Sequence, residues 1–107
     1  MKTAFAFAAL LAASGFTVAH ASSDDAWSGF RAEVSKACIA AAKGLIQNGK
    51  ALVDPFGSEN YGLAVVSGRA AGAKATVSTI CVFDKKTKKA EIGGEISAGE
   101  LLVKTGK

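Results

Sequence analysis

Apolar side chains recur at steps of three and four residues along the first part of the chain. The positions are Trp27, Phe30, Val34, Cys38, Ala41 and Leu45. This spacing puts them on a single stripe of an α-helix. The pair Asn48-Gly49 is typical of a helix end. We therefore predict an amphipathic helix over Asp24–Ile46, with Trp27 and Phe30 as core anchors; the alternative for Trp27 is a ring that stacks on a ligand.

Further along the chain, apolar residues alternate with polar or small ones, as in β-strands. Ala75–Phe83 is the clearest such stretch, and its alternate residues from Val77 to Phe83 share one face. Tyr61–Gly68 is a second, and its small residues indicate the close approach of another element. A return strand is predicted over 90–96 with a bulge at Gly93-Gly94. Shorter strands are predicted over 50–53 and 100–103.

Turn-forming residues separate these strands. Asp54–Asn60 contains the only proline of the chain and predicts a loop. Arg69–Lys74 is rich in alanine and glycine and is typical of a turn. Asp84–Lys88 is polar and predicts a hairpin turn between two strands. The chain shows no internal repeat.

The first 21 residues have the pattern of a cleavable secretory signal. Lys2 is basic, residues 4–13 are apolar, and Ala19-His20-Ala21 is a small-x-small cleavage site before Ser22. The apolar stretch is shorter than the roughly 20 residues of a membrane-spanning helix. The alternative is an N-terminal helix of a cytosolic protein. We predict a signal peptide at 1–21, a single small domain at 22–107 without a transmembrane segment, and a periplasmic location.

Cys38 and Cys81 are the only cysteines. Export would place them where disulfides persist. The 107 residues less the 21 of the signal leave 86, a small domain that a disulfide would help to stabilise. Such a bridge would join the helix stripe to one strand face, and the alternative is a pair of free thiols. The packing expected from the bridge sets Trp27, Phe30 and Val34 over Val77 and Phe83. The predicted fold is α+β, one N-terminal helix packed on an antiparallel sheet of three to five strands.

Removing the signal would also remove His20, the only histidine. Acid–base catalysis, Ser or Cys triads and most metal sites then lack their usual residue. The chain has no phosphate-binding or dinucleotide-binding glycine motif in the required context. The net charge of +4 falls to +3 with the loss of Lys2, which is far from a nucleic-acid-binding signature. We expect a protein without catalytic residues, cofactor, metal or nucleic-acid partner.

The loop that ends at Tyr61 is the first candidate site, since loops held on a rigid sheet often recognise partners. Asp54 and Glu59 bracket it and could form the carboxylate pair of a glycosidase. The alternative is that Asp54 begins a turn before Pro55 while Glu59 is solvated, and a small domain leaves little room for a catalytic cleft. The loop could also be only a connection. Its candidate partner-binding residues are Asp54, Phe56, Ser58, Glu59, Asn60 and Tyr61.

A run of lysines in the hairpin is the second candidate site. Lys85, Lys86, Lys88 and Lys89 fall within five residues. They could form a patch for an anionic partner, such as a cell-wall polymer or lipid headgroups. The alternative is a solvated turn whose charges keep it soluble.

Three stretches, Asp54–Ala64, Ile80–Lys85 and Glu91–Glu95, resemble a family of small exported alphaproteobacterial proteins. That family includes a periplasmic inhibitor of peptidoglycan hydrolases such as lysozyme. The resemblance covers most of the mature chain, through motifs that do not identify a mechanism. The pattern of the C-type lysozyme inhibitors, which are eight-stranded barrels, is absent from this sequence.

This resemblance implies a periplasmic inhibitor whose loop inserts into the glycan cleft of a lysozyme or lytic transglycosylase. Glu59 or Asp54 would meet basic groups of the cleft, while Ser58 and Asn60 would replace sugar hydroxyls. A mature charge of +3 gives no long-range attraction to basic lysozymes, which favours a less basic hydrolase. Two other functions stay open: an envelope-binding module that uses the lysine hairpin, and a small secreted effector or structural envelope protein.

Overall fold

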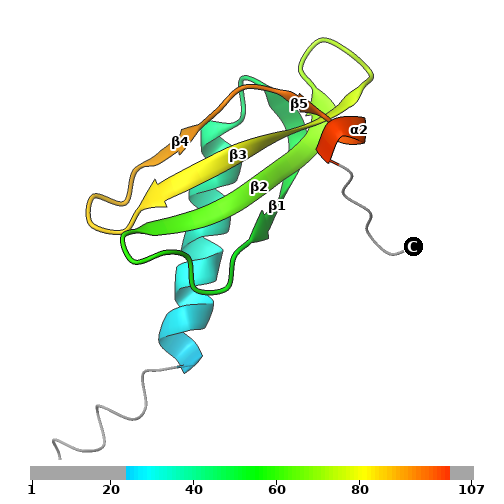
Figure 1. Cartoon of the computed structure of the whole chain (residues 1–107). Helices are drawn as coiled ribbons and strands as arrows, with labels where there is room; N and C mark the ends of the chain where they lie inside the picture. The colour runs from blue at the N-terminus through cyan, green and yellow to red at the C-terminus, as the bar shows by residue number, and fades with distance from the viewer. Residues whose placement is uncertain (1–23, 102–107) are drawn as a thin grey trace, which may run out of the picture.

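A single long helix lies across one face of an antiparallel β-sheet (Figure 1). The computed structural model describes residues 24–101, and the predicted signal peptide therefore lies outside the described residues. The helix spans 24–41. The other elements are β1 (Ile46–Val53), β2 (Tyr61–Ala70), β3 (Thr76–Asp84), β4 (Ala90–Ile92), β5 (Ile96–Ser97) and α2 (Ala98–Leu101). The predicted α+β fold is confirmed.

The sheet follows the order of the chain. Its strand order is β1-β2-β3-β4, and β5 pairs with β3 beyond the end of β4. All pairings are antiparallel, and the β2–β3 register runs from Tyr61 opposite Asp84 to Arg69 opposite Thr76. This topology brings the β1–β2 loop and the β3–β4 hairpin to the same end of the sheet (Figure 1).

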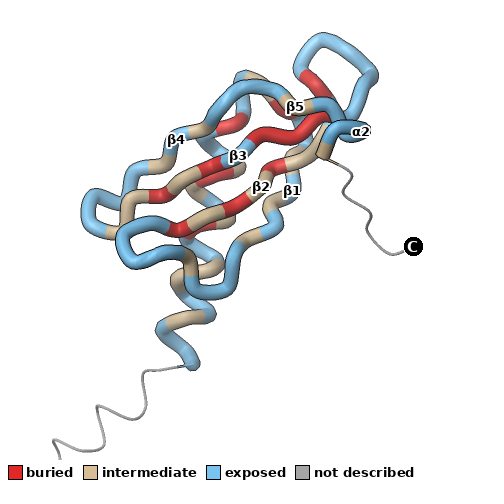
Figure 2. The backbone as a smooth tube through the Cα atoms, viewed as in Figure 1, coloured by how far each residue is buried: buried red, intermediate tan, exposed pale blue. Residues whose placement is uncertain are grey.

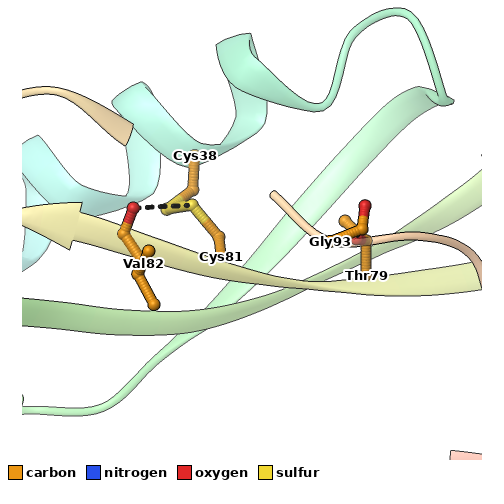
Figure 3. The surroundings of a disulfide bond; sticks show 5 residues. All are labelled: Cys38, Thr79, Cys81, Val82 and Gly93. Carbon is orange, nitrogen blue, oxygen red and sulfur yellow. Dashed lines mark hydrogen bonds between the residues drawn. A yellow bond between two sulfur atoms is a disulfide. The ribbon is translucent and has the colours of Figure 1, made fainter. Parts of the chain in front are cut away.

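Residues 93–95 interrupt the last part of the sheet, where a bulge is predicted. The register places Ile92 opposite Cys81 and Ile96 opposite Ser78, so three residues face two residues of β3. The Thr79 hydroxyl donates to the Gly93 carbonyl at 2.9 Å, which ties the interruption to β3 (Figure 3). The extra residue accords with the predicted bulge.

The core fills the space between the helix and the sheet. Strand residues alternate between buried and partly exposed positions, as the sequence predicts (Figure 2). The buried hydrophobic residues are Val34, Cys38, Ala42, Ile46, Ala64, Val66, Ala70, Val77, Cys81 and Phe83. The face of β3 predicted from Val77 to Phe83 is therefore the inner one.

A disulfide joins Cys38 of the helix to Cys81 of β3, and both residues are fully buried (Figure 3). Their Cα atoms are 5.9 Å apart, within the usual range for a bridge. The predicted pairing is confirmed, and it holds the last turn of the helix against β3, an interior strand of the sheet.

Two glycines allow the close packing expected along β2. A Cβ atom on Gly62 would lie 2.6 Å from Val34 Cγ2, and one on Gly68 would lie 2.7 Å from Ile46 Cγ2. Both distances are too short for any residue larger than glycine without movement. The small residues of this strand therefore mark where the helix and β1 approach it most closely.

The predicted end of the helix is wrong. The helix stops at residue 41, residues 42–45 form a turn, and Ile46 begins β1 opposite Ala70. Ala42, rather than the predicted Ala41, is buried. Residues from Ile46 onward join the sheet because pairing with β2 satisfies their backbone hydrogen bonds. The local spacing of apolar residues gives no sign of this pairing. Asn48-Gly49 then causes an irregularity in β1, where Asn48 has φ 53° and the register shifts before Lys50.

The other end of the domain also differs from the prediction. Residues 98–101 form the short helix α2, where the sequence predicts a strand over 100–103. Residues 102 and 103 of that prediction lie outside the described residues. In the part of the chain that is described, no helix is both long and apolar enough to cross a membrane.

Candidate functional site

The 54–61 loop connects β1 to β2 and lies beside the β3–β4 hairpin. Its first half is fixed by Asp54. Oδ1 of Asp54 accepts hydrogen bonds from the N–H groups of Gly57 at 2.9 Å and Phe56 at 3.1 Å. These two bonds, that of Gly57 foremost, lower the pKa of Asp54 from its ordinary value of 3.8. A glycosidase acid needs a raised pKa, so the geometry fits a turn-forming carboxylate, the alternative weighed above.

The second half of the loop closes on itself through Ser58 and Tyr61. The N–H of Ser58 donates to the Tyr61 carbonyl at 2.8 Å, and the N–H of Tyr61 donates to Ser58 Oγ at 3.2 Å. Gly57 adopts a φ of 73°, and a Cβ atom there would collide with the Tyr61 carbonyl. Glycine is therefore required at this corner. Ser58, predicted to contact a partner, uses its hydroxyl inside the loop.

Lys85 connects the hairpin to the loop. Its ammonium group donates to the carbonyls of Ser58 at 2.7 Å and Phe56 at 3.1 Å, and its backbone N–H donates to the Asn60 carbonyl at 3.1 Å. The two candidate sites of the sequence analysis are thus one connected surface. Sequence reasoning missed this contact, because nothing in the local sequence distinguishes Lys85 from the three lysines that follow it.

Aromatic rings of the helix lie against the loop. Trp27 packs edge-to-face with Phe56 at 5.0 Å and with Phe30 at 5.4 Å. The Lys85 ammonium lies 5.1 Å from the Phe30 ring centre and 5.6 Å from that of Trp27. Arg31 of the helix adds a hydrogen bond of 3.4 Å to the Pro55 carbonyl. The helix therefore fixes the position of the loop as well as the core.

The prediction that Trp27 is a core anchor is wrong in one respect. Trp27 is half-buried and lies outside the core cluster. Phe30 packs against that cluster, and its ring centre lies 6.4 Å from the ring centre of Phe83. A small cavity of about 240 Å³ beside the two rings is bordered by Lys85 and Lys88. Trp27 is thus a support for Phe56 rather than a member of the core.

The lysine hairpin is not a uniform basic patch. Asp84 Oδ1 accepts hydrogen bonds from the N–H groups of Thr87 at 3.0 Å and Lys86 at 2.8 Å, which lower the pKa of Asp84. Lys88 forms an exposed ion pair with Glu33 at 3.2 Å. With Lys85 bound to the loop, Lys86 and Lys89 are the lysines of the run for which the described residues show no side-chain partner.

The loop presents a mixed surface to solvent. Phe56 is 55% exposed and Tyr61 is 43% exposed, while Glu59 and Asn60 are exposed at the tip. A hollow of about 500 Å³ lies between loop and hairpin. It is lined by Glu59, Asn60, Tyr61, Asp84, Lys85 and Lys86. Aromatic rings beside polar groups on a fixed backbone are typical of surfaces that bind other macromolecules.

Metal binding has little support in this region. Among residues 24–101, no group of three or more His, Cys, Asp or Glu side chains is placed to hold a metal ion. The carboxylates of Asp54 and Asp84 are each occupied by two backbone N–H groups. Comparison with protein-family models, curated proteins and solved structures finds no match to this chain.

Proposed function

We propose that this protein is a periplasmic, non-enzymatic binding protein that inhibits a peptidoglycan hydrolase by inserting the 54–61 loop into its glycan cleft. The observation that carries this proposal is the internal bracing of an exposed loop. Six hydrogen bonds between its backbone and the side chains of Asp54, Ser58 and Lys85 hold the loop. A loop fixed before binding loses little conformational entropy on association, which favours tight complexes.

The contacts divide the predicted residues into two groups. Asp54 and Ser58 shape the loop, so they act as positioning residues. Phe56, Glu59, Asn60 and Tyr61 are the exposed residues that would reach a partner. Phe56 and Tyr61 offer ring faces and edges where a glycan-binding cleft receives sugar rings, and Glu59 and Asn60 offer hydrogen-bonding groups where it receives hydroxyls.

The inhibition of glycan hydrolysis by the purified protein is the direct test. We expect dose-dependent inhibition of a lysozyme or a lytic transglycosylase acting on isolated peptidoglycan. Replacing Asn60 or Glu59 with alanine should raise the inhibition constant by about tenfold or more, as for a central interface residue. Glu95→Ala is the matched control, since Glu95 is exposed and lies in the 93–95 interruption. Full hydrolase activity at micromolar excess of the protein, with both enzymes, would refute the proposal.

Binding to an anionic cell-wall polymer or lipid through the lysine hairpin is the second candidate. It is weakened by the engagement of Lys85 and Lys88 within the domain, but Lys86 and Lys89 are exposed. Co-sedimentation with isolated sacculi and with anionic vesicles separates the two functions. Loss of co-sedimentation in a Lys86→Glu, Lys89→Glu variant that still folds would favour this candidate.

A further inference from the structure

The face of the sheet opposite the helix, here called the outer face, is unusually apolar. It is the face turned to the viewer in Figure 1, with the helix behind it. Leu52 is 70% exposed and Ile80 is 53% exposed. Antiparallel sheets with one solvated face normally carry polar residues there. Exposed apolar residues grouped on one face indicate a contact surface.

The strand registers arrange this face in three rows. The central row is Leu52, Val65 and Ile80, which lie opposite one another on β1, β2 and β3. On one side Lys50, Ser67 and Ser78 form a row of which the two serines hydrogen-bond at 2.7 Å. On the other side Leu63 pairs with Val82 and Val82 with the exposed Glu91 of β4, and the Asp54 N–H extends the ladder to Leu63. The face thus has an apolar centre flanked by two different rows.

The two flanking rows also differ in the size of their side chains. A hollow of about 500 Å³ lies beside the serine row, and its lining includes Ser67 and Ser78, Lys50 and Leu52 of β1, and Ala98 of α2. The other row carries the branched side chains of Leu63 and Val82. A row of small side chains and a row of larger ones, each two residues from the centre, allow the face to fit a second copy of itself.

We propose that the outer face is the interface of a homodimer with two-fold symmetry. An axis that crosses the strands at the central row would place Leu52, Val65 and Ile80 against the same residues of the second copy. The same rotation sets the Leu63–Val82 row of each copy over the serine hollow of the other. Such reciprocal contacts are the property of a two-fold interface, and face-to-face sheets commonly pack about 10 Å apart.

Charge supports the same arrangement. Lys50 and Asp54 lie two residues before and two residues after Leu52. The axis through Leu52 therefore brings each Lys50 toward Asp54 of the partner subunit, giving two oppositely charged pairs at the edge of the interface. This complementarity favours the two-fold orientation over one in which like charges meet.

The size of the face is sufficient for a weak or moderate dimer. Nine register pairs along β2 and β3 correspond to a length of about 30 Å, and four adjacent strands to a width of about 19 Å. The interface is then roughly 500 Å² per copy, or about 1,000 Å² for both, near the lower limit of specific interfaces. We therefore expect dissociation constants in the micromolar range rather than an obligate dimer.

Sedimentation equilibrium of the exported, processed protein, from about 1 to 500 μM, is the test. We expect a reversible dimer whose dissociation constant rises by about tenfold or more in Ile80→Glu, because a carboxylate would be buried at the centre. Lys50→Glu should weaken it less, and more at low salt than at high salt. Phe56→Glu is the matched control, since Phe56 is equally exposed but lies on the loop. Thermal melting checks that each variant folds.

Three results would overturn the proposal. One is a monomer at every concentration. Another is an equal effect of Ile80→Glu and Phe56→Glu on dimerisation. The third is a dimer that forms only after residues 102–107 are removed, which would assign the face in the intact protein to the chain's own C-terminal segment. The hydrolase assay is independent of all three, so the two proposals can fail separately.

Discussion

Replacing Lys85 with methionine should loosen the 54–61 loop while leaving the core intact. Methionine keeps most of the aliphatic stem and removes the ammonium group that donates to the Ser58 and Phe56 carbonyls. A hydrogen bond from a charged group contributes about 1.5–3 kcal/mol when well buried. Lys85 is only partly buried, so we take roughly 0.5–1 kcal/mol for each bond.

The two aromatic faces under the ammonium add roughly 0.5 kcal/mol together at this degree of exposure. The total loss is then about 1.5–2.5 kcal/mol of local stability. This corresponds to an opening equilibrium of the loop that rises roughly 10- to 70-fold. The effect should be confined to the loop, because the core cluster includes no atom of Lys85.

Native-state hydrogen exchange of the Ser58 and Tyr61 amides measures this opening, since both amides are bonded within the loop. Lys86→Met is the matched control: it removes the same charge from the next residue, whose side chain is exposed. We expect faster exchange in Lys85→Met and no change in Lys86→Met. Equal exchange rates in the two variants would refute the bracing role of Lys85.

Further predictions concern the rest of the domain. Reducing the Cys38–Cys81 bridge should lower the free energy of unfolding by about 4 kcal/mol, because the bridge closes a separation of 43 residues; denaturant unfolding with and without reductant measures it. Gly62→Ala should destabilise by about 1–3 kcal/mol through overpacking, whereas Gly29→Ala, in open space on the helix, should stabilise by about 0.5–1 kcal/mol. The lowered pKa of Asp54 means that its stabilisation of the loop is present above pH about 4 and is lost as the pH falls through that lowered value. An NMR titration that places the carboxyl pKa above 3.8 would contradict this.

The architecture could be predicted because two periodicities and one pairing of cysteines determine most of it. The change from steps of three and four to alternation separates helix from sheet, and the Cys38–Cys81 bridge relates the two. The error at the end of the helix has a physical reason. Leu45 and Ile46 suit either a helix stripe or a strand, and only the pairing of Ile46 with Ala70, which lies 24 residues further along the chain, decides between them.

The position of the site along the chain could be predicted from the sequence, but the contacts that hold its residues in place could not. The proline, the glycine and the turn-forming residues of 54–61 predict an exposed loop, and the lysine run predicts a hairpin. The bonds from Lys85 to the loop span 27 and 29 residues of sequence, so no local pattern contains them. Trp27 could not be placed from the local sequence either. Its position on the apolar stripe predicts burial, but its ring packs edge-to-face with Phe56 of the loop.

The two proposals together predict how many hydrolase molecules each chain binds. The two-fold axis that crosses the strands reverses their direction, so the 54–61 loops of the two copies would lie at opposite ends of the dimer. The loops could not enter one cleft together, and each copy would bind its own hydrolase molecule. Titration of a hydrolase should therefore end at one enzyme per chain whether the inhibitor is monomeric or dimeric. Ile80→Glu should weaken the dimer and leave the inhibition constant unchanged, because Ile80 lies on β3 and the loop is braced by residues other than Ile80.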